Sequence, residues 1–411
     1  MTQAWTGVFL AALGLAGALR LWLSLRQERC VRAHRDAVPD AFAAHVPPEA
    51  HRKAADYTVA RLRLGRVALG WRAAVLLAFT LGGGLELLGS VFDGATLLGG
   101  AGFVLAAFFL AEVAQLPLAA WRTFRIEERF GFNRTTPGLF AKDLARTAAL
   151  GLLLGGPLAA GALWVMREGG ALWWVWLWAG WLAVSLFFTW AYPAWIAPLF
   201  WTFRPLDDAA LRERIAALLA RVGFRAEAIS VMDGSRRSAH ANAYFTGLGE
   251  KKRIVLFDTL CETLRPDEIE AVLAHELGHF RLRHLWRRLA AGAAMGLLAL
   301  GGFALVADQA WFFEGLGVSS TRPDAALVLY LWVLPLFTFP LAPLLSAWSR
   351  RHEYEADAFA AAHADAAAMV RALVRLYEHN ASTLTPDPLY STFFDSHPPA
   401  PLRVARLRET A

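Results

Sequence analysis

Seven long apolar segments constrain what this chain can fold into more than any other feature. Each approaches or exceeds the ~20 residues that an α-helix needs to cross a bilayer. They are residues 5–25, 67–92, 95–121, 144–166, 171–200, 286–306 and 325–348. Because a backbone in lipid must satisfy its own hydrogen bonds, these segments predict an all-α multi-pass membrane protein with seven transmembrane helices. The composition agrees, since 56% of the 411 residues are hydrophobic and only 18% are charged.

The charges between the apolar segments predict the orientation of the chain. The loops after the first, third and fifth segments are rich in Arg and Lys, whereas the alternate loops carry few basic residues. Basic loops remain in the cytoplasm, so we expect the N-terminus outside and the C-terminus inside. The expected location is the cell inner (plasma) membrane, with the first segment retained as a span because no small-residue cleavage site follows it.

The remaining composition narrows the range of partners. The net charge of +6 comes from Arg residues clustered in the predicted cytoplasmic loops, which favours a lipid bilayer over nucleic acid as the partner. Cys30 and Cys261 are far apart and predict neither a disulfide framework nor a CxxC metal site. The sequence makes no prediction about the oligomeric state.

The loop from about 202 to 285 is the largest polar segment. It contains an amphipathic helix and three short strands, predicted at 207–222, 228–233, 243–248 and 253–257. The last two strands are expected to pair through a turn at 249–252. A further helix is predicted to begin at Pro266, because Pro suits the first helical position and acidic residues follow in the first turn.

This helix carries the pentapeptide HELGH at 275–279. His275 and His279 are four residues apart and share one helix face, so both imidazoles can bind one zinc ion. Glu276 then lies beside the metal, where it can accept a proton from a water that the metal activates. A surface helix with two ordinary histidines is the alternative. Apolar residues flank the motif, however, and burial of these polar groups without partners would cost several kcal/mol.

A third ligand must come from elsewhere in the chain. The HExxHxxGxxH extension fails because Leu282 and Leu285 replace Gly and His. His284 lies nine residues after His275, so a continuous helix would point it away from the metal. We therefore expect His284 to be a polar residue near the membrane surface.

A second helix after the last apolar segment offers carboxylates. Glu353 and Asp357 are four residues apart and share a face, whereas Glu355 should point to solvent. Glu353 is thus the better third ligand, and Asp357 could accept the spare N–H of a zinc-bound histidine. Spacing alone leaves open that this segment is an ordinary charged helix end.

Several segments together carry a resemblance to a known family. They are HELGH at 275–279, SRRHEYEADAF at 349–359, SHPP at 396–399, and the stretches 130–136, 196–200, 233–238 and 242–245. This set resembles the type I CAAX prenyl proteases, which are integral-membrane zinc endopeptidases that process prenylated C-termini. The match covers nearly the whole chain in order.

The resemblance implies a role for particular residues. The implied ligands of one zinc ion are His275, His279 and Glu353, and the implied general base is Glu276. His397 would donate to the oxyanion, and Asn242 with Ala243 would form the strand edge that holds the substrate backbone. Arg403 matches a further family position and is expected to support the site. The resemblance also implies seven helices around a water-filled intramembrane chamber, with the zinc site on its cytoplasmic side.

Polar residues within the apolar segments give independent hints of such a chamber. Intramembrane carboxylates usually face an interior, so we expect Glu86 and Glu112 to face a cavity. Arg20, Arg72 and Asp308 lie nearer to segment ends, and we expect them to extend to the membrane surface.

The predicted organisation has four consecutive units. They are helices one to five (1–201), a catalytic loop domain with a small β-hairpin or sheet (202–285), helices six and seven (286–348) and a C-terminal catalytic segment (349–411). The predicted function is zinc-dependent endoproteolysis near the C-terminus of prenylated or other membrane-associated peptides.

Two alternatives stay open. One is a quality-control metalloprotease that degrades misfolded membrane proteins. The Ala- and Arg-rich composition is typical of a high-GC bacterium, in which endogenous prenylated C-termini are not expected. The other is a channel or transporter with structural zinc, which would need a closed four-ligand site. The sequence offers no fourth ligand in register and no inverted repeat.

Overall fold

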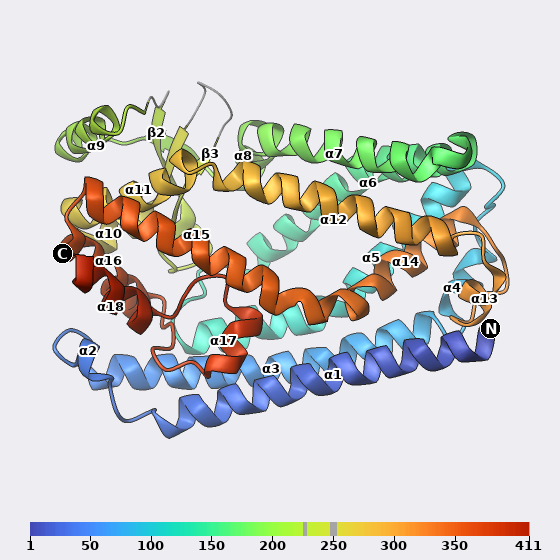
Figure 1. The fold of residues 1–411 in the computed structure, drawn as a ribbon, viewed down its shortest axis with the longest axis horizontal. Coiled ribbons are helices and arrows are strands. Elements are labelled where there is room, and N and C mark those ends of the chain that lie inside the picture. Colours follow the sequence, from blue (N-terminus) through green and yellow to red (C-terminus); the bar gives the residue numbers. More distant parts are fainter. Residues whose placement is uncertain (225–227, 247–252, 411) are drawn as a thin grey trace.

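Long helices whose axes lie roughly along the long dimension of the molecule form most of it (Figure 1). The structure, a computed structural model, describes residues 1–224, 228–246 and 253–410. The long helices are α1 (Thr2–Ala33), α3 (Pro48–Phe79), α5 (Leu97–Trp121), α6 (Pro137–Glu168), α7 (Trp173–Ala191), α12 (His284–Val306), α14 (Pro323–Thr338) and α15 (Ala342–His363). The chain ends lie at opposite ends of this bundle (Figure 1). The predicted multi-pass helical fold is thereby confirmed.

Six helical stretches among the described residues are long and apolar enough to cross a membrane. They are Thr2–Ala33, Leu97–Glu127, Pro137–Glu168, Gly170–Phe200, His284–Val306 and Pro323–His363. Helix α3 is as long as the others and lies against α1, where Val31, Ala55 and Val59 form a small buried cluster. From its midpoint onward it carries Arg63, Arg66 and Arg72, which explains why it is less apolar than the rest.

The predicted second span, 67–92, is wrong at its C-terminal end. Helix α3 stops at Phe79, and a short helix, α4 (Gly84–Gly89), follows. Gly83 has a left-handed φ of 78°, and a Cβ on Gly82 would lie 2.7 Å from the Ala78 carbonyl oxygen. The glycine triplet therefore ends the helix. Glu86, which lies on α4, accepts a hydrogen bond from the Ser319 backbone N–H (3.0 Å) and does not line the cavity described below, contrary to the prediction.

An aromatic cluster holds together the helix ends near the N-terminus. Phe9, Phe103, Phe303, Phe312 and Phe313 are all buried there, where α1, α5, α12, α14 and the short α13 (Ala310–Glu314) meet. Figure 1 shows α13 and the N-terminus at the end of the bundle that lies far from the sheet, and these large side chains form a buried cluster among the helices there.

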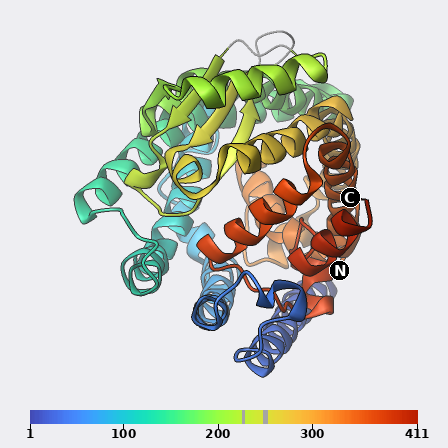
Figure 2. The same cartoon turned by 90° about the vertical axis from the view of Figure 1, so that its left-hand side faces the viewer.

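A four-stranded sheet lies at the other end of the bundle (Figure 2). Its order is β1 (Phe203–Pro205), β2 (Ala228–Met232), β4 (Arg253–Phe257) and β3 (Ala243–Thr246). The predicted antiparallel pairing of the last two strands is confirmed, with Tyr244 opposite Val255. The predicted turn at 249–252 and the last two residues of the predicted strand lie outside the described residues. The three-residue strand β1 was not predicted from the sequence.

Helices surround this sheet and complete the second core. They are α9 (Ala209–Arg221), α10 (Asp258–Thr263), α11 (Pro266–Arg281) and α16 (Ala366–His379). Leu218, Ile254, Leu256 and Leu273 are buried together at the centre. Helix α11 begins at Pro266 as predicted, and the Glu268 carboxylate accepts a hydrogen bond from the Arg265 N–H (2.9 Å), which stabilises this helix end.

The C-terminal segment folds back against the bundle through α17 (Pro388–Phe394) and α18 (Ala400–Thr410). The Arg26 side chain on α1 donates hydrogen bonds to Asp387, so the segment is attached to the first long helix (2.9 Å for the shorter bond). The shorter connecting elements are α2 (Asp40–Ala43), η1 (Arg122–Glu127), η2 (Gly170–Leu172), η3 (Tyr192–Ile196), α8 (Ala197–Phe200), η4 (Gly234–Arg236) and η5 (Phe339–Leu341).

Candidate metal centre and active site

The crossing of α11 and α15 brings the predicted ligands together. Gly278 allows the close approach, because a Cβ there would lie 3.0 Å from the Ala356 Cα atom. The Nε2 atoms of His275 and His279 lie 3.3 Å apart. Glu353 on α15 faces both imidazoles, with its oxygens 3.4 Å from His275 Nε2 and 3.3 Å from His279 Nε2. Two residues of one helix and one of another thus converge on a single point.

The chemistry of these three residues fits a zinc ion. Their donor atoms all lie within 4.8 Å of one another. The buried Oε2 atom of Glu353 accepts no hydrogen bond among the described residues, although two imidazole nitrogens lie 3.4 and 3.5 Å away. An orphaned buried acceptor of this kind costs about 1–3 kcal/mol, and a bound cation would offset the cost. Two imidazole nitrogens and one carboxylate are a common set for catalytic zinc, and they leave a further coordination position open.

A buried ion pair between Asp357 and Arg403 orients His275 on the side of its ring opposite Glu353. Its Nδ1 atom lies 2.8 Å from Asp357 Oδ1, and the Arg403 Nε–H donates to the other Asp357 oxygen (2.8 Å). All three side chains are buried. Burial acts to lower the pKa of His275, yet the contacts with the Asp357 and Glu353 carboxylates outweigh it and raise the pKa to about 9. A bound cation would take the place of this second proton, because a metal-bound imidazole is neutral.

His279 is oriented by a residue whose position was predicted wrongly. Helix α11 ends at Arg281, and Arg283 adopts a left-handed φ of 57°. His284 therefore starts a new helix and turns back, which puts its Nδ1 atom 2.9 Å from His279 Nδ1. The prediction that His284 points away assumed one continuous helix. The signal available in the sequence was the histidine five residues after HELGH, but helical phase alone could not interpret it.

Glu355 holds His284 in place and does not point to solvent as predicted. It lies 3.0 Å from His284 Nε2, and its side chain is 29% exposed. Arg287 and Arg351 also donate to this carboxylate (3.2 and 3.0 Å). The His352 ring stacks on His284 with the centroids 4.1 Å apart. Because two arginines already neutralise Glu355, we interpret this second histidine cluster as a support for His279 and not as another metal centre.

Glu276 lies on α11 next to His275, one of the three candidate metal ligands. Burial raises the pKa of its carboxyl, and the positive charges of His275 and His279 act in the opposite direction. A general base in the interior of a protein commonly has such a raised pKa, since desolvation disfavours the carboxylate.

His397 approaches the same point from the C-terminal segment. Its Nε2 atom lies 3.5 Å from Glu353 Oε2, and its Nδ1 atom lies 3.0 Å from the Ser396 hydroxyl. The side chain is 61% exposed because it faces a cavity, while the protein behind it still desolvates the ring. This desolvation lowers the pKa of His397, so the neutral imidazole is favoured.

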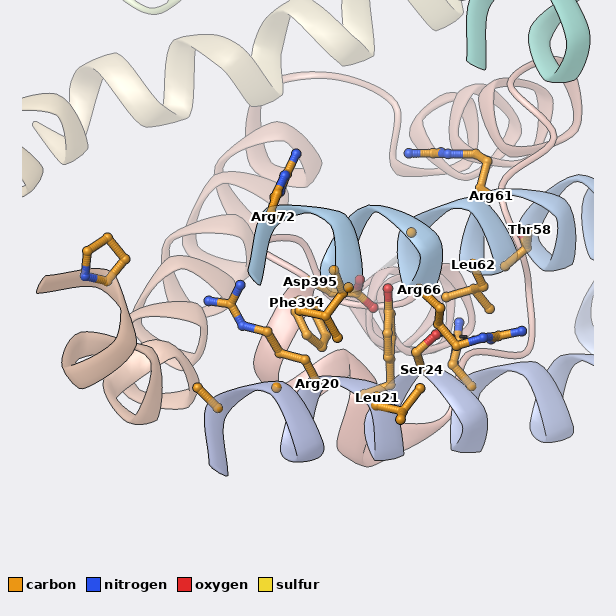
Figure 3. A pocket seen from close by; sticks show the side chains of 18 of the residues that line it. Arg20, Leu21, Ser24, Thr58, Arg61, Leu62, Arg66, Arg72, Phe394 and Asp395 are labelled. Atoms are coloured by element: carbon orange, nitrogen blue, oxygen red, sulfur yellow. Dashed lines mark hydrogen bonds between the residues drawn. The ribbon is translucent and has the colours of Figure 1, made fainter. Parts of the chain in front are cut away.

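The cavity that His397 faces has a volume of about 1310 Å³. It is bounded by α1, α3, α5, α14 and the C-terminal segment, and part of its wall is shown in Figure 3. Glu112 lines it, as predicted. Arg20 and Arg72 also line it, although we predicted that they extend to the membrane surface. Both arginines lie on the side of their helix that faces the cavity, which explains why they line it.

The predicted substrate-binding residues lie at an open sheet edge. Asn242 immediately precedes β3, and its carbonyl accepts a hydrogen bond from the Phe257 N–H (3.0 Å). Its exposed side chain accepts from the Ala243 N–H (2.8 Å), whereas Ala243 is itself buried. Strand β3 pairs with β4 on one side, and no strand among the described residues pairs with its other side. This edge can accept an extended peptide by strand addition.

Comparisons with known proteins agree with this geometry. Residues 27–202 match the family model for the CAAX prenyl protease N-terminal region with five membrane helices, and residues 205–411 match peptidase family M48. A CAAX prenyl protease 1 homolog from Arabidopsis thaliana is 38% identical over 307 residues, which cover 74% of this chain and 72% of the relative. The CAAX prenyl protease 1 of Saccharomyces cerevisiae is 35% identical, with 72% and 69% covered.

A solved structure shows the same architecture. The crystal structure of S. mikatae Ste24p superposes with a TM-score of 0.92 at 28% sequence identity, and the match covers 98% of this chain and 99% of that one. The fold, the His-His-Glu cluster and the family matches agree with one another. This chain is an integral-membrane metallopeptidase and belongs to the CAAX prenyl protease 1 (Ste24) family of M48 peptidases.

Proposed function

We propose that this enzyme uses one zinc ion per chain to cleave prenylated peptides near their C-terminus. The observation that carries the proposal is the His275–His279–Glu353 cluster, whose neighbour His397 faces a cavity of about 1310 Å³ between apolar helices. A cavity of this size and position suits a peptide whose lipid group lies in the membrane. The relatives named above are described as CAAX prenyl proteases, which supports this substrate class.

Zinc bound by these residues would act as a Lewis acid and lower the pKa of a water molecule. Glu276 accepts the proton from this water and later transfers it to the leaving amine. His397, as a neutral imidazole, donates a hydrogen bond to the developing oxyanion. The β3 edge at Asn242 and Ala243 aligns the substrate backbone.

Two hydrogen-bonded partners keep the histidines in position. Asp357, neutralised by Arg403, orients His275, while His284 orients His279. Such partners fix the tautomer and the direction of each ligand, and their loss typically weakens metal binding by roughly 10–100-fold.

We further propose that the active site faces the cytoplasm, with the N-terminus outside, in the cell inner (plasma) membrane. The basic loops and the chain ends at opposite ends of the bundle support this orientation. The bacterial source suggested by the composition rests on that composition alone, since the curated relatives named above are eukaryotic. Family membership favours hydrolysis over the channel or transporter alternative.

One experiment tests the proposal directly. The purified full-length protein with zinc is incubated in lipid vesicles with a prenylated peptide and with the same peptide lacking the prenyl group. We expect cleavage of the prenylated peptide that a zinc chelator abolishes and added zinc restores. Equal cleavage of both peptides would favour the quality-control alternative, and no effect of the chelator would refute the metal mechanism.

A further inference from the structure

Two arginines at one end of the cavity have no carboxylate partner. Arg20 on α1 and Arg72 on α3 both line the cavity, and Figure 3 shows them at the same side of the view. Within the part of the chain that the structure describes, no ion pair at 4.0 Å or less involves either of them. Glu112 and Asp395 also line the cavity, and neither forms such a pair with them.

The surroundings of these two guanidinium groups leave hydrogen-bonding capacity unused. Arg20 lies 4.1 Å over the centroid of the Phe339 ring, and its buried Nε atom has no hydrogen-bond acceptor among the described residues. Arg72 makes one long hydrogen bond, to Gln115 Oε1 at 3.5 Å. The two positive charges repel one another.

Two other arginines, Arg66 and Arg61, also line the cavity. Arg66 donates to the Glu28 carboxylate (2.5 Å) and to the Ser24 hydroxyl (3.2 Å). Arg61 lies over the Tyr57 ring at 5.4 Å and is eleven residues from Arg72, about 16 Å along α3. Arg61 also has no carboxylate partner within 4.0 Å among the described residues, but it lies at the other side of the view from Arg20 and Arg72 (Figure 3).

We propose that Arg20 and Arg72 bind an anion, namely the free C-terminal carboxylate of the peptide substrate. Two unpaired cations between apolar helices are unfavourable, and a shared carboxylate would relieve both the repulsion and the missing hydrogen bonds. The planar guanidinium donates two parallel N–H bonds, which matches the two oxygens of a carboxylate.

The contacts that connect Arg20 to the segment carrying His397 agree with this occupant. The Arg20 guanidinium lies over the Phe339 ring, and the centroids of the Phe339 and Phe394 rings are 6.0 Å apart. His397 follows Phe394 by three residues. In a CAAX-type substrate the carboxylate belongs to the third residue after the prenylated cysteine, which is about 10 Å away in an extended chain. This inference rests on the proposed function, because it places the residues after the cleaved bond between His397 and the two arginines.

The test compares peptides that differ only in the terminal group. Full-length protein with zinc, in vesicles of neutral phosphatidylcholine, receives prenylated peptides ending in a free carboxylate or in an amide. The variants are the double substitution Arg20→Gln/Arg72→Gln, the conservative Arg20→Lys/Arg72→Lys, and the control Arg52→Gln. Arg52 is on the same helix as Arg72 but is paired with Glu49 (3.1 Å) outside the cavity.

We expect the wild type and the Arg52→Gln control to have a KM for the acid that is lower than for the amide by roughly tenfold or more. The Arg20→Gln/Arg72→Gln variant should raise the KM for the acid to that of the amide while kcat stays unchanged. The lysine variant should recover part of the preference. An equal KM for both peptides in the wild type would overturn the proposal, as would a preference that survives the glutamine substitutions.

Two further measurements separate the possible failures. Equilibrium binding of the tripeptide product, as acid and as amide, tests the subsite without cleavage. A protein that cleaves no peptide would refute the proposed function, and the binding measurement would still decide this inference. Vesicles containing anionic phosphatidylglycerol test the competing occupant. If the arginine substitutions change only the response to this lipid, the anion is a lipid headgroup and the carboxylate assignment is wrong. Thermal unfolding should show no loss of stability in the double variant, because the substitutions remove a repulsion.

Discussion

His279 and His284 meet Nδ1 to Nδ1 at 2.9 Å across the break between α11 and α12. One nitrogen must donate and the other accept. The second nitrogen of His284 faces the Glu355 carboxylate at 3.0 Å, so this nitrogen carries the proton. A neutral His284 then accepts the Nδ1–H of His279, which leaves the Nε2 lone pair of His279 free for a metal. A chain of three residues thus sets the tautomer of one ligand.

Substitution of His284 should therefore weaken metal binding. We expect His284→Ala to raise the zinc dissociation constant by roughly 10–100-fold, because His279 loses the acceptor that orients it. Competition with a fluorescent chelator measures this constant. The control is His352→Ala, which removes only the ring stacked on His284. Equal losses in the two variants would mean that packing, and not the hydrogen bond, supports His279.

The buried pair of Arg403 and Asp357 should contribute strongly to stability. Arg403→Met leaves the buried Asp357 carboxylate with His275 as its remaining partner (2.8 Å), and loss of the charged hydrogen bonds from Arg403 should cost about 1.5–3 kcal/mol in the free energy of unfolding. Denaturation of the metal-free protein measures this cost without a contribution from zinc. The control Arg52→Met breaks the exposed pair with Glu49 and should cost at most about 1 kcal/mol. Similar costs for both would contradict the assigned burial effect.

Loss of the general base should separate catalysis from metal binding. Glu276→Gln should reduce kcat by roughly 10²–10⁴-fold, because an amide cannot accept the proton of the water. The zinc content, measured by elemental analysis, should stay at that of the wild type. Glu262→Gln changes an exposed glutamate on the neighbouring α10 and should leave kcat unaffected. A Glu276→Gln variant with wild-type kcat would exclude this residue as the base.

The acidity of Glu276 should appear in the pH dependence of cleavage. Burial disfavours its carboxylate and raises its pKa, so the base becomes protonated at a higher pH than an ordinary glutamate with a pKa of about 4.3. Activity should accordingly be lost as the pH falls through this raised value and be retained above it. The profile of kcat/KM against pH, at saturating zinc, measures this limb. A limb at or below about 4.3 would argue that another group controls it.

His397 should act on the rate and not on the metal. His397→Ala should lower kcat by roughly 10²–10³-fold, the usual effect of removing one oxyanion donor. The zinc dissociation constant should change little, since Glu353 keeps its contacts with both ligand histidines. Steady-state kinetics and chelator competition on the same preparation test both statements. A large loss of zinc with an unchanged kcat in the zinc-saturated variant would reverse the assignment.

Local periodicity was sufficient wherever one helix carried the whole pattern. The four-residue spacing predicted that His275 and His279 share a face, and that Glu353 and Asp357 do so on another helix. In the structure the first two converge with Glu353, and Asp357 contacts His275. The antiparallel pair at 243–248 and 253–257 was predicted in the same way, from alternation and a short connection.

The predictions failed where a helix stopped or where a cavity decided the direction of a side chain. His284 was placed on a continued helix, but the chain leaves the helical path at Arg283. Glu86 was placed in a span that the glycine triplet ends. Arg20 and Arg72 were expected at the membrane surface because nothing in their neighbours along the sequence reveals an internal cavity.

By itself, the sequence determined where most of the long apolar helices and the HELGH helix lie, which side chains share a helix face, and that the chain is a multi-pass membrane protein. These properties follow from interactions between residues a few positions apart. Only the tertiary structure decided that His284 and not solvent meets His279, that Arg403 neutralises Asp357, and that Arg20 and Arg72 share one cavity with His397. The first depends on how the chain turns between α11 and α12, and the other two depend on how distant helices pack against one another over the whole bundle.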